Sequence, residues 1–151
     1  ISTNTISFDE YIECRGVSFV LLVLSSGQFD FLRHVCDEVN INWFDMLLEF
    51  WHKVENDEGP LGQIYKGFIN ASHDELFESH EDIQRLIDDD ENYKRLLSGE
   101  LGENVMRNFV PKMEMDYFTE VIDEVFSIIK EMGEPALWLD DILEWARTVM
   151  V

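Results

Sequence analysis

Apolar residues recur at intervals of three and four positions through most of this 151-residue chain. The clearest stretch follows Asn42, where the apolar positions fall at i, i+4, i+7, i+8 and i+11: Trp43, Leu47, Phe50, Trp51 and Val54. This spacing places the five side chains on one face of an α-helix that the Asn42 side chain can cap. Similar patterns predict helices over 29–39, 61–70 and 139–149.

Two segments have the form of a capping box, in which a serine hydroxyl and a glutamate three residues later satisfy each other's backbone N–H groups. The first, Ser7-Phe8-Asp9-Glu10, predicts a helix that begins at Phe8, runs to residue 14 or 15 and stops at Gly16. The second, Ser72-His73-Asp74-Glu75, predicts another helix start ahead of Leu76 and Phe77.

The remaining apolar segments also favour helices. Val17–Leu24 (VSFVLLVL) has the composition of a strand, but the chain has no second strand-like run to pair with it, so we interpret it as a buried helix. A short helix is predicted from Ser79 through Ile87. Residues 105–132 have a helical pattern that we expect to break or kink near Pro111, since proline lacks the N–H donor and crowds the preceding turn.

These periodicities predict one all-α domain over residues 1–151, a single irregular bundle of about six to eight helices. No linker rich in glycine, serine or proline divides the chain, and we identify no internal repeat. Because the sequence begins with Ile1 rather than methionine, we interpret it as a fragment of a longer protein.

Acidic residues outnumber basic ones by 32 to 11, which gives a formal net charge of −21. The excess is present in both halves of the chain and is densest over 74–103, where we expect an exposed face. Such a field repels phosphate backbones and anionic lipids, which argues against direct binding to nucleic acid or membranes. The longest apolar run has eight residues, whereas a membrane span needs about 20.

Few residues form a pattern typical of a metal site. Glu49 and His52 match Glu-x-x-His, the motif that di-iron bundles use in two copies, but no other histidine of this chain follows an acidic residue at that spacing. A second acidic cluster spans 73–81, where His73 and His80 are seven positions apart, too far to share an ion without a bend. Residues 88–99 imitate a calcium loop but lack its glycine and its final glutamate, which excludes that site.

No catalytic motif is present, so no catalytic residue and no cofactor is assigned within this chain, and an enzyme active site of its own is not expected. Cys14 and Cys36 could act as nucleophiles only if His34 or His52 approached them in the fold. Their wide spacing favours reduced thiols and a cytoplasmic setting.

The aromatic and sulfur-containing residues allow two interpretations. They either fill the core or form a docking face, because tryptophan and methionine are favoured at contact surfaces. The residues concerned are Trp43, Trp51, Trp138, Trp145, Met113, Met115, Met132 and Met150.

The segment from Ser7 to Arg15 (SFDEYIECR), followed by an apolar helix and by Phe29-Asp30-Phe31-Leu32, resembles the region just after the catalytic barrel of cobalamin-binding radical SAM proteins. Those proteins often carry a helical C-terminal extension there. The resemblance covers about the first 35 residues and implies an accessory domain that covers a substrate cleft or recruits a partner. The Cys-x-x-x-Cys-x-x-Cys motif of that family is absent from this chain, so no catalytic residue is carried over.

We therefore predict a non-catalytic, acidic, helical accessory or interaction domain. Its partner would be the upstream domains of the parent protein or a basic protein surface. Two alternatives remain open. One is a free-standing helical metalloprotein or enzyme that uses Glu49, His52 and carboxylates from another helix. The other is an acidic mimic of nucleic acid, suggested by charge alone.

Overall fold

The computed structural model describes residues 6–75, 80–98 and 104–149, and these residues contain no β-strand. They form nine α-helices and one 3₁₀ turn: α1 (Phe8–Leu24), η1 (Gly27–Phe29), α2 (Phe31–Glu38), α3 (Trp43–Asn56), α4 (Pro60–Glu75), α5 (His80–Asp88), α6 (Asp90–Leu97), α7 (Val105–Asp116), α8 (Phe118–Met132) and α9 (Trp138–Val149). The all-α class is confirmed, with slightly more helices than the six to eight predicted.

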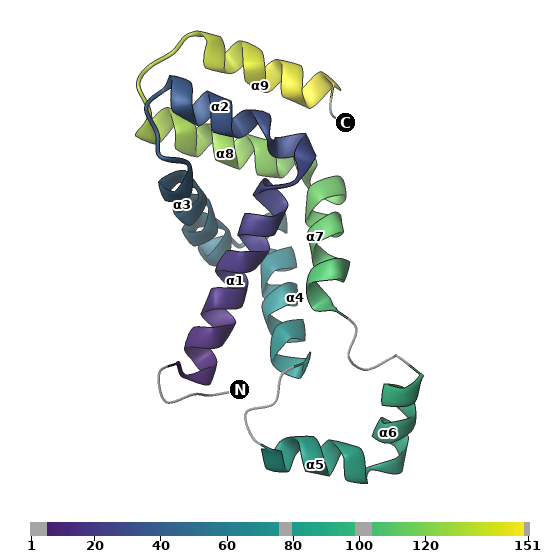
Figure 1. The fold of residues 1–151 in the computed structure, drawn as a ribbon. Coiled ribbons are helices and arrows are strands. Elements are labelled where there is room, and N and C mark those ends of the chain that lie inside the picture. Colours follow the sequence, from purple (N-terminus) through teal and green to yellow (C-terminus); the bar gives the residue numbers. More distant parts are fainter. Residues whose placement is uncertain (1–5, 76–79, 99–103, 150–151) are drawn as a thin grey trace.

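Helix α1 runs through the middle of the bundle and contacts α3, α4 and α7 (Figure 1). Helix α8 packs against α3, α4 and α7 and also contacts α9. Helices α2, α8 and α9 gather at one end of the molecule, whereas α5 and α6 lie at the other end (Figure 1). Most of the chain therefore surrounds one core, and two short helices lie apart from it.

Stacked aromatic rings join helices that are distant in sequence. Phe19 of α1 stacks on Phe68 of α4 with ring centroids 4.4 Å apart, and Phe29 of η1 stacks on Phe118 of α8 at 5.3 Å. All four side chains are buried. Burial of each ring stabilises the fold by roughly 1.5–3 kcal/mol, so these contacts help to fix the arrangement of the bundle.

The helix starts predicted at Ser7 and Asn42 are confirmed. The Ser7 Oγ accepts a hydrogen bond from the Glu10 N–H at 3.2 Å, and a Glu10 carboxylate oxygen accepts the Ser7 N–H at 2.7 Å. The Asn42 side chain accepts hydrogen bonds from the N–H groups of Phe44 and Asp45 at 2.8 and 3.2 Å. Both caps satisfy donors that have no partner inside the helix.

Gly16 lies inside α1 rather than at its end, so the predicted stop is wrong. A Cβ atom at this position would lie 2.2 Å from the hydroxyl oxygen of Tyr65 on α4. Glycine is therefore needed here for the close approach of α4. The helix continues because burial of its later turns outweighs the helix-propensity cost of glycine, which is about 1 kcal/mol.

The segment Val17–Leu24 is helical, as predicted, but only one side of it is buried. Leu21 and Leu22 face outward and are 40% and 49% exposed. The buried side of this segment consists of Phe19, Val20, Val23 and Leu24.

The capping box predicted at Ser72 is also wrong. Ser72 lies in the last turns of α4, and its side chain is fully buried. Helix α4 begins at Pro60, where the missing N–H of proline costs no helical hydrogen bond, and extends beyond the predicted range at both ends. Leu76 and Phe77, which the box was predicted to precede, lie outside the described residues.

Helix α7 continues through Pro111, and the break in the segment 105–132 comes at Tyr117 instead. Proline inside a helix costs about 3 kcal/mol because one hydrogen bond is lost and the preceding carbonyl is crowded. Val105 before the proline and Met113 after it are both buried. Packing on both sides of Pro111 therefore holds the helix together, so the predicted break is wrong at this position; the alternative of a kink there stays a prediction.

Helices α5 and α6 form a hairpin whose contacts are chiefly between its own two helices. No residue of α5 is buried, and none of the described side chains of α6 is buried. The exposed face expected over 74–103 is thus confirmed for residues 80–98.

Within the described part of the chain, no single helix is both long and apolar enough to cross a membrane. Of the described helices, only α1 taken together with residues 27–38 reaches that length and composition, and this pair is bent by 69°.

Candidate functional site

A groove of about 590 Å³ opens between the end of α3, the start of α4 and one face of α8. Nine residues from these three segments line it: Lys53, Val54, Asn56, Asp57, Pro60, Leu61, Glu120, Asp123 and Glu124. Val54 and Leu61 are buried and form an apolar floor. Four of the lining residues carry a carboxylate and one carries an amine, so the lining has a formal charge of −3 (one positive charge and four negative charges).

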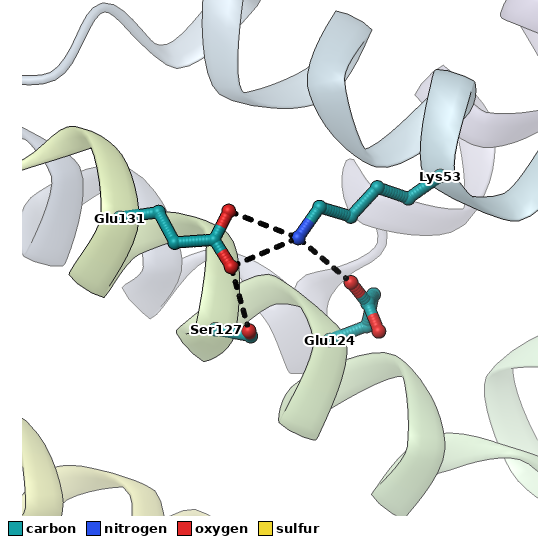
Figure 2. A network of polar contacts seen from close by, with 4 residues as sticks. All are labelled: Lys53, Glu124, Ser127 and Glu131. Atoms are coloured by element: carbon teal, nitrogen blue, oxygen red, sulfur yellow. Dashed lines mark hydrogen bonds and ion pairs between the residues drawn. The ribbon is translucent and has the colours of Figure 1, made fainter.

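Lys53 is held at the edge of the groove by two carboxylates of α8. Its Nζ lies 3.1 Å from both carboxylate oxygens of Glu131 and 3.4 Å from Glu124, and Glu131 also accepts a hydrogen bond from Ser127 (Figure 2). Desolvation by burial acts to lower the pKa of Lys53, but the two glutamates outweigh it and raise this pKa. The amine is therefore charged and fixed between α3 and α8.

Asp57 is fixed by the start of α4. Its carboxylate accepts the N–H of Gly62 at 2.8 Å, and backbone hydrogen bonds from Gly59 and Gly62 lower its pKa below the usual value of 3.8. The positive end of the α4 dipole favours the same charge. Asp57 consequently presents a permanent negative charge at one wall of the groove.

Two further acidic residues of α8, Glu120 and Asp123, also line the groove. Asp123 pairs with Arg147 of α9 at 2.6 Å, an exposed ion pair that links the groove to the last helix. Glu120 is exposed in the first turn of α8. Glu120 thus adds a further carboxylate to the lining, from a segment far from Asp57 in the sequence.

This arrangement suits a cationic group. An ammonium or guanidinium group that enters the groove can rest its alkyl part on Val54 and Leu61 and place its charge among the carboxylates. A phosphate or another anion would be repelled by the same lining. The lining of the groove is therefore chemically better suited to a basic side chain than to an anion.

A second pocket, of about 400 Å³, lies between α1, α3 and α4. Its lining mixes carboxylates and basic groups: Asp9, Ile12, Glu13, Glu55, Tyr65, Lys66, Ile69, Asn70 and His73. The hydroxyl of Tyr65 accepts a buried hydrogen bond from the Trp51 indole at 2.8 Å, and burial raises the pKa of this tyrosine. Tyr65 thus serves to lock three helices together at the wall of the pocket.

The structure does not bring the predicted metal ligands together. Glu49 is half-buried and His52 is exposed on α3, where the His52 ring packs against Trp51 with centroids 4.5 Å apart. No group of three or more histidine, cysteine, aspartate and glutamate side chains within 6–75, 80–98 and 104–149 is placed to hold a metal ion. Glu49 and His52 therefore gain no third ligand in this part of the molecule.

Residues of the other acidic and histidine clusters make contacts within the protein itself. His73 lies against Phe8 with ring centroids 5.5 Å apart, and Glu78, a further residue of that cluster, lies outside the described residues. In the calcium-like segment, the Asp89 carboxylate accepts hydrogen bonds from the N–H groups of Glu91 and Asn92 at 2.9 and 3.0 Å. This segment therefore forms the start of α6.

Both cysteines are free. Cys36 is fully buried, and burial together with the charge of Asp37 raises the pKa of its thiol to about 11. A thiol in this state is a packing residue rather than a nucleophile. Cys14 is exposed on α1.

The tryptophans and methionines divide between the core and the surface. Trp51 and Met113 are buried, and Trp43 is half-buried under the guanidinium of Arg33. The exposed members are Met115, Met132, Trp138 and Trp145, and Met150 lies outside the described residues. The core interpretation is therefore confirmed for Trp51 and Met113, whereas a docking face remains a prediction for the exposed residues.

The groove itself was not predicted. Its carboxylates belong to 53–57 and to 120–124, and only the packing of α3 on α8 brings these segments together. The one signal in the sequence was the pairing of an excess of acid with amphipathic helices. Searches against known protein families, curated proteins and solved structures find no match to this chain.

Proposed function

We propose that this protein is a non-catalytic, acidic, helical interaction domain that binds a basic protein surface. The observation that carries the proposal is the groove between α3, α4 and α8, where four carboxylates lie beside an apolar floor and two of them, Glu124 and Asp123, pair with Lys53 and Arg147. A basic side chain of a partner would enter this groove, and the net charge of −21 would accelerate the encounter.

The basic surface belongs, in this proposal, either to upstream domains of a longer parent protein or to a separate cytoplasmic partner. The resemblance of the first 35 residues to the extension of cobalamin-binding radical SAM proteins supports the first of these. In that setting the domain supplies contact surface, while the chemistry belongs to the parent enzyme.

A charge reversal in the groove tests the proposal. We expect Glu120→Lys to weaken binding of a fluorescein-labelled peptide of lysine, serine and glycine by about fivefold. The substitution replaces a groove carboxylate with an amine that repels the lysines of the peptide. Fluorescence anisotropy at low salt and at about 0.15 M salt measures the affinity, and the difference between variants should shrink as salt is added.

The matched control is Glu38→Lys, which makes the same change of net charge at an exposed position of α2 outside the groove. We expect this variant to bind within about twofold of the unmodified protein, since exposed charges outside the contact contribute little. Equal losses in the two variants would show that the peptide responds to net charge alone, which contradicts a role for the groove. Absence of binding at low salt would contradict the proposed function as a whole.

A further inference from the structure

The last helix has an apolar edge that its neighbours leave uncovered. Leu139 and Ala146 of α9 are buried, whereas Trp138, Trp145 and Val149 are 37%, 44% and 59% exposed. The three exposed residues fall at i, i+7 and i+11, which places them on one stripe of the helix beside the buried side. We call this stripe the α9 edge.

The α9 edge is held in a fixed position. The Trp145 ring meets Phe31 of α2 edge-on, with centroids 5.7 Å apart and an angle of 87° between the ring planes. Two ion pairs tie α9 to α8: Arg147 with Asp123 at 2.6 Å and Lys130 with Asp140 at 2.5 Å. A pre-positioned tryptophan loses little conformational entropy on binding, and for this reason tryptophan is favoured at the energetic centre of interfaces.

The charges beside the α9 edge select the kind of partner. The exposed carboxylates of Asp141 and Glu144 lie within one helical turn of Trp145, whereas Arg147 is engaged with Asp123. A partner that covers the two tryptophans must therefore place basic groups next to its own apolar residues. A second copy of this chain is a poor occupant, since each copy brings a net charge of −21 and the same acidic border.

We infer that the α9 edge docks an amphipathic helix of a partner protein, with an apolar stripe that covers Trp138, Trp145 and Val149 and with lysine or arginine at its border. This inference rests on the proposed function and adds the apolar half of the same partner surface. The groove residue Asp123 pairs with Arg147 on the flank of α9 opposite the α9 edge, so the edge and the groove are separate contact surfaces.

Two peptides of identical composition separate the apolar contact from the charge contact. One is a helix-forming peptide of leucine and lysine with a single leucine stripe, and the other is a scrambled sequence with no stripe. We expect the unmodified protein to bind the striped peptide about tenfold more tightly than the scrambled one, because only the striped helix buries apolar surface against α9. A leucine and glutamate peptide with the same stripe should bind far more weakly than the lysine peptide.

The test variant is Trp138→Gln combined with Val149→Gln, which keeps the Trp145 contact with Phe31 intact. We expect its preference for the striped lysine peptide to fall well below tenfold, because only Trp145 of the α9 edge remains, while its thermal unfolding midpoint stays close to that of the unmodified protein. The matched control is Tyr93→Gln, an aromatic residue that is 45% exposed on α6 at the far end of the molecule, and it should keep the full preference.

The outcomes distinguish this inference from the proposed function. If the double variant keeps the preference while Glu120→Lys weakens both lysine peptides, the α9 edge is not the docking surface and the groove proposal stands. If neither lysine peptide binds the unmodified protein, both proposals fail. If sedimentation shows a dimer that the double variant dissociates, a second copy covers the edge and our assignment of the occupant is wrong.

Discussion

Helices α8 and α5 have the same kind of amphipathic sequence, yet α8 buries seven of its 15 residues and α5 buries none of its nine. The difference lies in their neighbours. Helix α8 contacts α3, α4, α7 and α9, whereas the contacts of α5 are chiefly with α6. An apolar stripe thus predicts a helix, but the amount of stabilisation depends on how many other helices reach the stripe.

The comparison also separates two sources of helix stability. An isolated helix shorter than about 12 residues is marginal in water, so packing supplies most of the stability of a helix in a folded protein. The helices other than α5 and α6 obtain this packing from the core that they share. The α5–α6 hairpin has only the contact between two short helices of nine and eight residues. We therefore expect the two regions to respond very differently to removal of an apolar side chain.

The largest effect is expected for Phe126→Ala in α8. Phe126 is fully buried, and truncation of a buried phenylalanine removes favourable transfer energy and leaves a cavity. We expect the free energy of unfolding to fall by about 3–5 kcal/mol, measured by urea denaturation with circular dichroism. A loss below about 1 kcal/mol would show that α8 is not the centre of the core.

A smaller but more specific effect is expected for Gly16→Ala in α1. The added Cβ would lie 2.2 Å from the Tyr65 hydroxyl, which is fixed by its hydrogen bond with Trp51. Alanine gains about 1 kcal/mol in helix propensity, but overpacking and displacement of the buried tyrosine cost more. We expect a net loss of about 1–2 kcal/mol in the free energy of unfolding, measured in the same way.

The matched control removes the atom that the new Cβ would meet. The Tyr65→Phe background removes this hydroxyl. The nearest remaining atoms are the ring Cζ of residue 65 and the Trp51 Nε1, at 3.2 and 3.3 Å from the new Cβ. In this background Gly16→Ala should lower the free energy of unfolding by much less. The coupling in this double-mutant cycle measures the contact between α1 and α4 directly. If the two substitutions change the free energy of unfolding in a strictly additive way, contact with the Tyr65 hydroxyl is not the reason that glycine is needed at position 16.

The sequence was sufficient for the all-α class and for those helix starts where a cap depends only on neighbouring residues, as at Ser7 and Asn42. It was misleading where tertiary packing overrides local preference. Gly16 is needed for a close helix approach rather than for a stop, and Pro111 is held inside α7 by burial on both sides.

The groove could not be predicted from the sequence for the same reason. Its residues Asp57 and Glu120 are more than 60 positions apart and meet only in the fold. Trp138 and Trp145 of the α9 edge are among the residues for which the sequence offers a docking face, and that role stays a prediction.

The smallest effect is expected in the hairpin, for Ile83→Ala combined with Ile87→Ala. The two side chains are 38% and 42% exposed, and α5 packs chiefly on α6, so their truncation removes less buried surface than truncation in the core and leaves no enclosed cavity. Alanine also has the higher helix propensity, which offsets part of the lost contact. We expect the free energy of unfolding of the whole domain to change by less than about 0.5 kcal/mol.

Ile128→Ala in α8 is the matched control, because it makes the same substitution at a fully buried isoleucine and should cost about 2–5 kcal/mol. A loss above about 1 kcal/mol in the hairpin variant would mean that its apolar face packs against the body in solution, and the contrast between the two regions would then fail.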